Sequence, residues 1–228
     1  MRLVVITGAS QGIGAALAHA FAEISDMQLV LMARSREKLS NVAGDTGAEV
    51  RPCDVTDDEE VARVAREVVS TFGAPDVLVN NAGRFAPSPL TELAPGNFRE
   101  QLEVNLTSAF LVTRAFLPAM EKRGTGHIFY MGSVASKQAF RGAAAYCAAK
   151  HGLLGLARTV REETKHTGLR VTTVLPGATL TPSWKGTELP ESRFMDVMDV
   201  ARSLVNIWQL SGRTVVEEVL LRPQLGDI

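Results

Sequence analysis

Thr7 to Gly14 read TGASQGIG, and this stretch carries more structural information than any other part of the 228-residue chain. It follows the apolar run LVVI at residues 3–6 and leads directly into AALA at residues 15–18. Glycines let a backbone turn tightly and approach a pyrophosphate, whose charge is favoured by the free N–H groups at a helix start. The spacing is G-xxx-G-x-G rather than G-x-G-x-x-G. The stretch predicts a nucleotide-binding strand–turn–helix unit, with a purely structural turn as the alternative.

Short runs rich in Val, Ile and Leu alternate with longer amphipathic stretches along the whole chain. This alternation is typical of an α/β fold in which helices cover both faces of a parallel sheet. We expect seven strands, at residues 3–7, 29–33, 49–53, 77–80, 127–131, 170–175 and 215–221. We expect six helices, at residues 13–24, 36–43, 57–72, 97–122, 144–166 and 196–210.

No internal repeat or Ser/Gly-rich linker divides the sequence, so a single domain spanning residues 1–228 is expected. Residues 84–93 and 178–194 escape the strand and helix pattern, and each follows a strand. Ligands of open parallel sheets bind beyond the carboxyl ends of the strands. These two loops are therefore expected to form walls of a substrate pocket, with a short lid at residues 178–196.

The composition excludes several classes of function. The chain has 24 Lys and Arg against 25 Asp and Glu, so it lacks the basic surplus of a nucleic-acid binder. No apolar run approaches the roughly 20 residues of a membrane helix, and residues 3–6 are too short for a signal peptide. Cys53 and Cys147 lie far apart without a CxxC motif, and there are four histidines. We expect a reduced cytoplasmic protein without a metal site.

Two residues are placed for proton transfer. Tyr146 and Lys150 stand four apart in a helical stretch, so their side chains share one helix face. An isolated tyrosine hydroxyl titrates near pH ~10, and an ammonium roughly 5 Å away lowers that pKa by stabilising the phenolate. Tyr146 is expected to act as a general acid or base, with a half-buried helix tyrosine as the ordinary alternative.

Five motifs occur in order along the chain: TGASQGIG, Asn80-Asn81-Ala82-Gly83 after the fourth strand, Ser133 after the fifth, Tyr146-Cys147-Ala148-Ala149-Lys150, and Pro176-Gly177 after the sixth. Ser133 precedes Tyr146 by 13 residues, and Asn105 precedes Ser133 by 28. In order and spacing these motifs resemble the short-chain dehydrogenase/reductase family over nearly the whole chain. The resemblance implies a single-domain, Rossmann-type, doubly wound parallel sheet that binds NAD or NADP.

The resemblance also implies the roles of four catalytic residues. Tyr146 is the general acid when a carbonyl is reduced, and Ser133 donates to the carbonyl oxygen. Lys150 hydrogen-bonds the nicotinamide ribose, and Asn105 holds a water that continues a proton relay. In this family the helices at 97–122 and 144–166 commonly pair across a two-fold axis, so a homodimer or homotetramer is expected.

The second strand ends at Ala33, where a carboxylate would favour NAD, and Arg34, Ser35 and Arg36 follow. Guanidinium groups bind phosphate through paired, charge-assisted hydrogen bonds, so NADP(H) is expected over NAD(H), with a solvated helix start as the alternative. Asp54 resembles the adenine contact of the family but could equally cap a helix. The expected cofactor-binding residues are Gly8, Ser10, Gln11, Gly12, Ile13, Gly14, Arg34, Ser35, Asp54, Val55, Asn81, Ala82, Gly83, Tyr146, Lys150, Pro176, Gly177, Thr179 and Thr181.

Three aromatic residues, Phe85, Phe140 and Trp184, come from segments expected to meet above the nicotinamide, which favours a flat or apolar carbonyl substrate. Residues 120–140 (MEKRGTGHIFYMGSVASKQAF), 176–184 (PGATLTPSW) and 214–228 (TVVEEVLLRPQLGDI) are similar to bacterial sepiapterin-reductase-type members, which reduce side-chain carbonyls of a pterin with NADPH. The expected activity is NADPH-dependent reduction of a ketone or diketone to an alcohol. The alternatives are a sepiapterin reductase, a 3-oxoacyl-[acyl-carrier-protein] reductase and a non-enzymatic NADP-sensing regulator.

Overall fold

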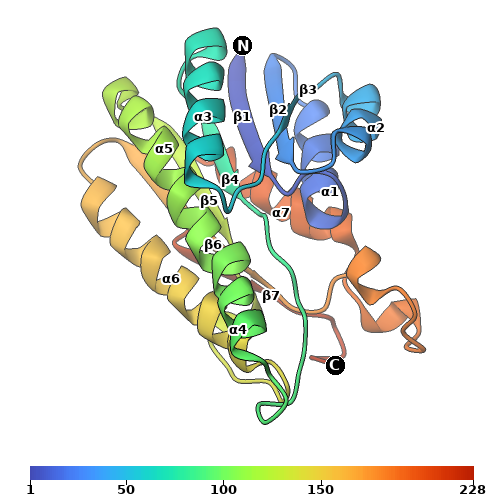
Figure 1. The fold of residues 1–228 in the computed structure, drawn as a ribbon. Coiled ribbons are helices and arrows are strands. Elements are labelled where there is room, and N and C mark those ends of the chain that lie inside the picture. Colours follow the sequence, from blue (N-terminus) through green and yellow to red (C-terminus); the bar gives the residue numbers. More distant parts are fainter.

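A computed structural model describes residues 1–228, in which seven parallel strands form one sheet of order β3-β2-β1-β4-β5-β6-β7 (Figure 1). The strands are β1 (Arg2–Thr7), β2 (Met27–Ala33), β3 (Glu49–Pro52), β4 (Val77–Asn80), β5 (Gly126–Met131), β6 (Leu169–Pro176) and β7 (Glu218–Leu221). The strand order reverses between β1 and β4, which is the switch point at which doubly wound sheets bind ligands. The predicted Rossmann-type fold class is confirmed.

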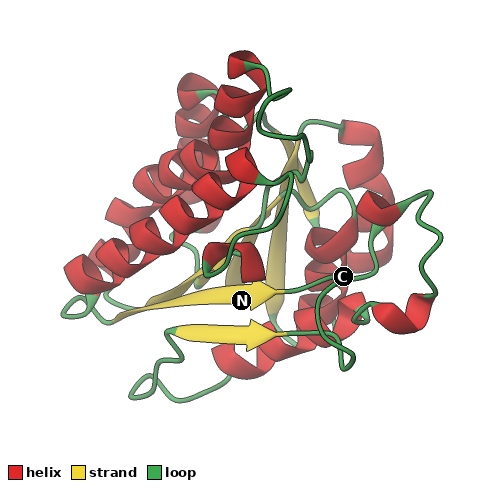
Figure 2. Ribbon diagram, turned by 90° about the horizontal axis from the view of Figure 1, so that it is seen from below, coloured by secondary structure: helices red, strands yellow, loops and turns green.

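Helices cover both faces of this sheet (Figure 2). They are α1 (Gly12–Ala22), α2 (Arg36–Thr46), α3 (Asp58–Phe72), α4 (Pro95–Leu102), α5 (Ser108–Arg123), α6 (Ala144–Thr164) and α7 (Val197–Trp208). Helix α1 packs against α2 and α7 on one face. On the other face α5 packs against α3 and α6, and α4 extends this layer against α6.

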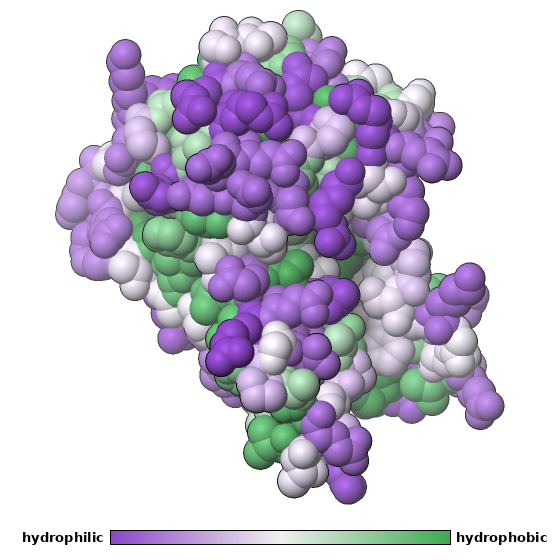
Figure 3. All heavy atoms as spheres, in the orientation of Figure 1, coloured by the Kyte–Doolittle hydropathy of each residue, from purple (hydrophilic) through white to green (hydrophobic).

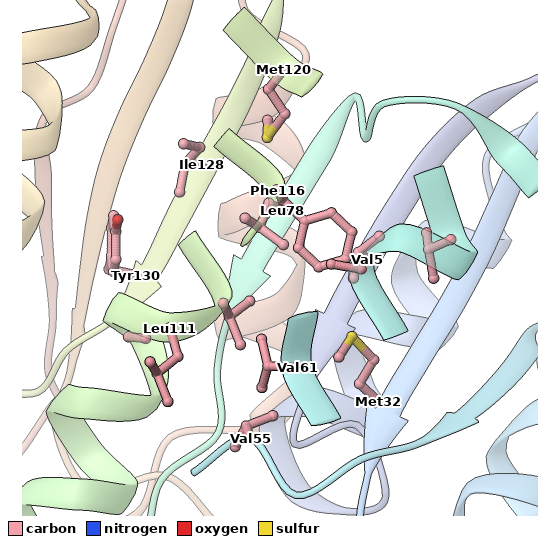
Figure 4. Packing of buried hydrophobic residues seen from close by; sticks show 14 of the residues in the cluster. Val5, Met32, Val55, Val61, Leu78, Leu111, Phe116, Met120, Ile128 and Tyr130 are labelled. Atoms are coloured by element: carbon pink, nitrogen blue, oxygen red, sulfur yellow. The ribbon is translucent and has the colours of Figure 1, made fainter. Parts of the chain in front are cut away.

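The apolar strands have two buried faces because helices lie on both sides. Leu3 and Val5 of β1 pack into the cluster shared with α3, α5 and α6, whereas Val4 and Ile6 pack with α1, α2 and α7. Successive strand residues point to opposite faces, so a continuous apolar run is required here rather than an alternating one. Figure 4 shows the first cluster, in which Phe116 of α5 lies against β-strand side chains.

Polar residues cover most of the outer surface seen in Figure 3, and hydrophobic residues are visible between them across the middle of this face and on its lower projections. None of the helices combines the length and the apolar character that a bilayer span requires.

The helix predicted at residues 97–122 differs from the observed one. It begins two residues earlier, where Pro95 occupies the first helical turn, and a π-helical turn at Glu103–Thr107 separates α4 from α5. Proline suits this position because its missing N–H would have no partner there. The π turn inserts one residue into the helix and places Asn105 inward. Such turns are frequent at functional sites.

The last strand is shorter than the predicted 215–221, because only Glu218–Leu221 pairs with β6 as a strand. The carbonyl of Val216 instead accepts the Thr172 hydroxyl at 2.6 Å, which takes this segment out of the regular ladder. The last helix begins at Val197, one residue after the predicted start, because Asp196 is its N-cap: the Asp196 carboxylate accepts a hydrogen bond from the N–H of Met198 at 2.7 Å.

His127 is a fully buried ionisable residue at the start of β5. Its Nε2 lies 2.7 Å from the Thr172 hydroxyl, its ring stacks on Phe129, and its Nδ1 has no partner. Burial, with a smaller contribution from the charge of Arg170, lowers the pKa of His127 to about 2. Between about pH 2 and 6.5, His127 is therefore protonated in the unfolded chain and neutral in the folded chain.

We predict that His127 makes the fold sensitive to acid. Stability is lost as pH falls below the unfolded pKa, and the contribution reaches about 2 kcal/mol at pH 5. The variant His127→Gln keeps a donor near Thr172 but does not titrate, so its free energy of unfolding should fall less between pH 7 and pH 5. Urea unfolding at both pH values checks this, with exposed His166→Gln as the control. Equal pH dependence in His127→Gln and the unmodified protein would contradict the prediction.

Candidate active site

The site is built at the carboxyl ends of β1, β4, β5 and β6, where four loops meet. The glycine turn follows β1, Asn81–Gly83 follow β4, Ser133 follows β5, and Gly177 follows β6. Parallel strands place all these loops on one edge of the sheet, so residues far apart in sequence come together there.

The glycine turn packs closely against the start of α1 and the loop after β4. Gly8 and Gly12 have φ angles of +63° and +57°, which favour glycine over residues with a side chain. A Cβ atom on Gly14 would lie 2.3 Å from the carbonyl oxygen of Gly8, so only glycine lets the helix approach the turn this closely. Gln11 gives α1 no side-chain cap. The turn thus holds the start of α1, whose first N–H groups have no side-chain cap, close to the end of β1, an arrangement that suits a pyrophosphate.

Thr7 and Asn81 join the ends of β1 and β4. The Asn81 side-chain amide donates to the carbonyl oxygens of Thr7 and Gly8 at 2.9 and 3.2 Å. The Thr7 hydroxyl accepts the backbone N–H groups of Asn81 and Ala82 at 3.0 and 3.1 Å. The side chain of Asn81 is therefore engaged by the protein itself, so its role is to hold the turn. Sequence reasoning missed Thr7, although a threonine directly before the glycine turn was visible.

Two exposed arginines, Arg34 and Arg36, lie at the start of α2, and neither forms an ion pair. Ser35 is the N-cap of α2, and its hydroxyl accepts the N–H of Lys38 at 3.3 Å. This corner carries two free guanidinium groups beside a helix N-terminus, which suits a phosphate group.

Asp54 does not cap the following helix, because Asp57 fills that position. Its carboxylate accepts the N–H and hydroxyl of Thr56 at 3.0 and 2.7 Å. Burial raises the pKa of Asp54, but the Thr56 hydrogen bonds and the Arg34 charge outweigh it and hold the pKa below its usual value. The carboxylate therefore stays ionised within reach of the Arg34 corner.

Tyr146 and Lys150 lie on one face of α6, as predicted, with the Lys150 Nζ 5.6 Å from the centre of the tyrosine ring. Lys150 is 4% exposed and donates to the carbonyl oxygen of Met131, the last residue of β5, at 2.7 Å. Ser133 stands two residues beyond that strand end, and its hydroxyl also accepts the N–H of Ala135 at 3.1 Å. The three predicted catalytic side chains thus converge around the end of β5.

The protonation of this group differs from the expectation. Burial raises the pKa of Tyr146, and the hydrogen bond to Ser133 offsets it only in part, so the protein by itself does not lower that pKa. Burial also lowers the pKa of Lys150 to about 8. The net lowering expected for the Tyr146 pKa is therefore not found in the protein alone, because burial outweighs the hydrogen bond that lowers it.

Asn105 contacts backbone rather than Lys150. Its Oδ1 accepts the N–H of Arg84 at 3.0 Å, and its Nδ2 donates to the carbonyl oxygens of Arg84 and Gln101 at 2.9 and 3.0 Å. A Cβ atom on Gly83 would lie 2.8 Å from Asn105 Oδ1 and 3.5 Å from Lys150 Nζ. Because Gly83 has no side chain, the side chains of Asn105 and Lys150 both lie close to its backbone.

Gln101 is a further site residue that sequence reasoning missed. It is 2% exposed, and its Nε2 donates to the carbonyl oxygen of Ala86 at 2.9 Å. Its Oε1 also accepts Asn105 Nδ2 at 3.2 Å. Asn105 and Gln101 thus bind the loop after β4 at two residues, Arg84 and Ala86. The signal in the sequence was a second amide residue four positions before Asn105.

The predicted substrate aromatics do not all meet. Phe85 packs edge to face on Tyr146, with ring centres 5.0 Å apart, and Phe140 packs in the small cluster that includes Tyr146. Trp184 instead packs edge to face on Phe194, 4.9 Å away, within the lid segment. The lid begins beside the glycine turn, since a Cβ atom on Gly12 would lie 3.5 Å from Thr181. Thr179 is buried, and its hydroxyl donates to the carbonyl oxygen of Gly177 at 3.0 Å.

The chain is similar to known proteins over nearly its whole length. The family model described as short chain dehydrogenase matches residues 2–192. A sepiapterin reductase from Chlorobaculum tepidum is 37% identical over an alignment of 238 residues, gaps included. The alignment covers 99% of this chain and 98% of that protein.

Two solved structures are similar over their full length. An alcohol dehydrogenase from the archaeon Thermococcus sibiricus, complexed with 5-hydroxy-NADP, superimposes with a TM-score of 0.92 at 30% identity, covering 100% of this chain and 99% of that one. A variant of actinorhodin polyketide ketoreductase with NADPH has a TM-score of 0.90 at 28% identity, covering 100% and 98%.

We predict that Lys150 destabilises the fold at neutral pH. Its folded pKa of about 8 lies below the unfolded value of 10.5, so the unfolded chain binds more protons between these values and native stability rises with pH there. Replacing Lys150 by Met removes this dependence. The stability of the unmodified protein relative to Lys150→Met should therefore increase by about 2 kcal/mol from pH 7 to pH 10.

Urea unfolding of both proteins at both pH values measures this difference. Lys122→Met, which removes an exposed ammonium on α5, is the matched control and should show no such trend. If the stability difference between Lys150→Met and the unmodified protein stays constant with pH, burial does not lower the pKa of Lys150.

Proposed function

The chain belongs to the short chain dehydrogenase family, and we propose that it reduces a ketone or diketone of a small apolar or aromatic substrate to the alcohol, using NADPH. The observation that carries this proposal is the convergence of Ser133, Tyr146 and Lys150 at the end of β5, one loop away from the glycine turn. A hydride donor and a proton donor are the two requirements of carbonyl reduction, and this arrangement supports both.

NADPH would supply the hydride when bound. Tyr146 holds the proton that the carbonyl oxygen receives, and its raised pKa keeps the phenol protonated at neutral pH, which favours reduction. Ser133 donates to the same oxygen as negative charge develops on it. Lys150 would hold the nicotinamide ribose and, while protonated, would stabilise the tyrosinate left after proton transfer. Asn105 fixes the loop at Arg84, and the resemblance to the family implies that it also holds a water of the proton relay.

Four features support NADP(H). The glycine turn and the uncapped start of α1 suit the pyrophosphate, with Ser10, Gln11, Ile13 and Gly14 along it. Arg34 and Ser35 suit the 2′-phosphate, and Asp54 with Val55 borders the adenine side. Asn81, Ala82 and Gly83 would line the adenosine side, and Pro176, Gly177, Thr179 and Thr181 would lie against the nicotinamide half. Two similar structures contain 5-hydroxy-NADP and NADPH.

A pterin side-chain carbonyl is the second candidate substrate. It is favoured by the 37% identity to a sepiapterin reductase and by Phe85 and Phe140, which bring aromatic rings to Tyr146. The lid at 178–196, with Trp184, would then determine how the pterin ring is recognised. A 3-oxoacyl thioester is a third candidate, which similarity to a polyketide ketoreductase supports. The assembled catalytic residues argue against a regulator that only senses NADP. We further propose a cytoplasmic homodimer or homotetramer that pairs through α5 and α6.

We predict that Tyr146→Phe abolishes turnover without affecting cofactor binding. The loss of the general acid should lower kcat by about 10²- to 10⁴-fold. NADPH affinity, measured by fluorescence titration, should stay within about twofold. The other tyrosine of the chain provides the control, because the buried Tyr130 hydroxyl contacts only Thr113 and Tyr130→Phe should retain full activity. Normal turnover by Tyr146→Phe, with sepiapterin, a small diketone or an acetoacetyl thioester, would rule out this assignment.

We also predict that Arg34 selects the phosphorylated cofactor. A charge-assisted hydrogen bond contributes about 1.5–3 kcal/mol, so Arg34→Gln should weaken NADPH binding by roughly tenfold or more. NADH binding should change little, because NADH has no 2′-phosphate. Exposed Arg213→Gln is the control. A parallel loss of NADH and NADPH binding in Arg34→Gln would show that the residue does not read the phosphate.

A further inference from the structure

The C-terminal segment crosses the open edge of the site, and its polar side chains form a closed network there. Figure 1 shows this end of the chain beside the lid, on the side at which the strands finish. The Asp227 carboxylate accepts the Arg222 guanidinium at 2.7 Å and the Gln138 side-chain amide at 2.8 Å, both on Oδ2. Arg222 also donates to Gln138 Oε1 at 2.9 Å. Both ends of the Gln138 amide are thus held by the tail.

Gln138 belongs to the segment that joins Ser133 to Tyr146. Its N–H donates to the carbonyl oxygen of Val134 at 3.2 Å, next to the catalytic serine. Its carbonyl oxygen lies 3.9 Å from the thiol of Cys147, next to the catalytic tyrosine. The side chain held by the tail is therefore attached, through its own backbone, to the neighbours of both catalytic residues.

The same tail residue also contacts the lid. Arg193, in the 3-10 turn Glu191–Arg193, donates to the backbone carbonyl oxygen of Asp227 at 3.3 Å. Behind it the tail packs on Gly177, since a Cβ atom there would lie 3.1 Å from Pro223 and 3.4 Å from Asp227 Oδ1. Asp227 therefore touches the three segments that surround the substrate space: the loop before α6, the lid and the end of β6.

Two buried atoms destabilise the closed form of this network. Asp227 Oδ1 and Arg193 Nε are buried and have no hydrogen-bond partner. Unpartnered buried polar atoms are costly, and Arg222 remains 40% exposed at its side chain, where solvent weakens the ion pair. Closure therefore rests on a few hydrogen bonds that thermal motion or an entering ligand is able to break.

We propose that Asp227 and Arg222 are positioning residues that form a latch, which fixes Gln138 and the lid around the substrate space. The latch sets how tightly substrate is held, whereas the chemical step stays with Ser133, Tyr146 and Lys150. This effect on substrate binding rests on the proposed reductase function, but the ordering of residues 137–141 and 191–194 does not.

The test uses the full chain with Asp227→Asn, Arg222→Gln and the double variant. The first readout is hydrogen–deuterium exchange without any ligand. Each single variant should speed amide exchange at residues 137–141 by about tenfold, and Asp227→Asn should also speed it at residues 191–194. Because both side chains belong to one network, the double variant should exchange little faster than Asp227→Asn alone. Gln224→Ala, an exposed tail residue without a hydrogen bond, is the matched control.

The second readout is steady-state kinetics with NADPH and the ketone that the unmodified protein reduces fastest. Asp227→Asn should raise KM for the ketone at least fivefold while kcat and KM for NADPH stay within twofold, and Asp227→Glu should restore part of the loss. Unchanged exchange at residues 137–141 in Asp227→Asn would overturn the latch. A kcat loss with an unchanged KM would overturn its role in substrate binding. Absence of turnover in the unmodified protein would contradict the reductase function, and the exchange experiment would still decide on the latch.

Discussion

The hydrogen bonds between Thr7 and Asn81 are the contacts on which the remaining site geometry depends. They close the gap between β1 and β4, where the strand order reverses and where no ladder hydrogen bonds continue past the strand ends. With the gap fixed, Gly14 lies against Gly8, the start of α1 faces outward, and Gly83 follows between Asn105 and Lys150. Cofactor space and catalytic space thus share one anchored wall.

Burial explains both the stability and the chemistry of this wall. The two apolar clusters on either face of the sheet hold it rigid, while Tyr146 and Lys150 lie within the same water-poor environment. That environment disfavours charge on both groups, so each is poised closer to neutrality than it would be in water. Burying Lys150 lowers the stability of the fold at the place where a proton is transferred, which is a common trade between stability and activity.

Much of the fold and the catalytic set was predictable from the sequence, because both depend on local patterns. Apolar runs fixed six strands to within two residues, the edge strand β7 excepted, and the four-residue spacing of Tyr146 and Lys150 placed them on one helix face. The π turn at Asn105 was not predictable, since no local pattern shows that Asn105 makes hydrogen bonds to Arg84, a residue 21 positions away. The pKa direction of Tyr146 also failed, because it depends on how completely neighbouring segments exclude water. Trp184 faces Phe194 rather than Tyr146 for a similar reason, as lid packing is set by contacts that no local pattern encodes.

The π turn has a consequence for comparing and redesigning such chains. A π turn takes up one residue more than a regular turn of α-helix. Deleting a single residue within Glu103–Thr107 would therefore restore regular winding with α4 and α5 still in register, and Asn105 would be drawn away from its hydrogen bonds to Arg84. The length of this short segment therefore matters more than most of its residue types. When this site is transplanted or aligned with another sequence, a one-residue gap there signals the loss of the contact between helix and loop, even where Asn105 itself has a counterpart.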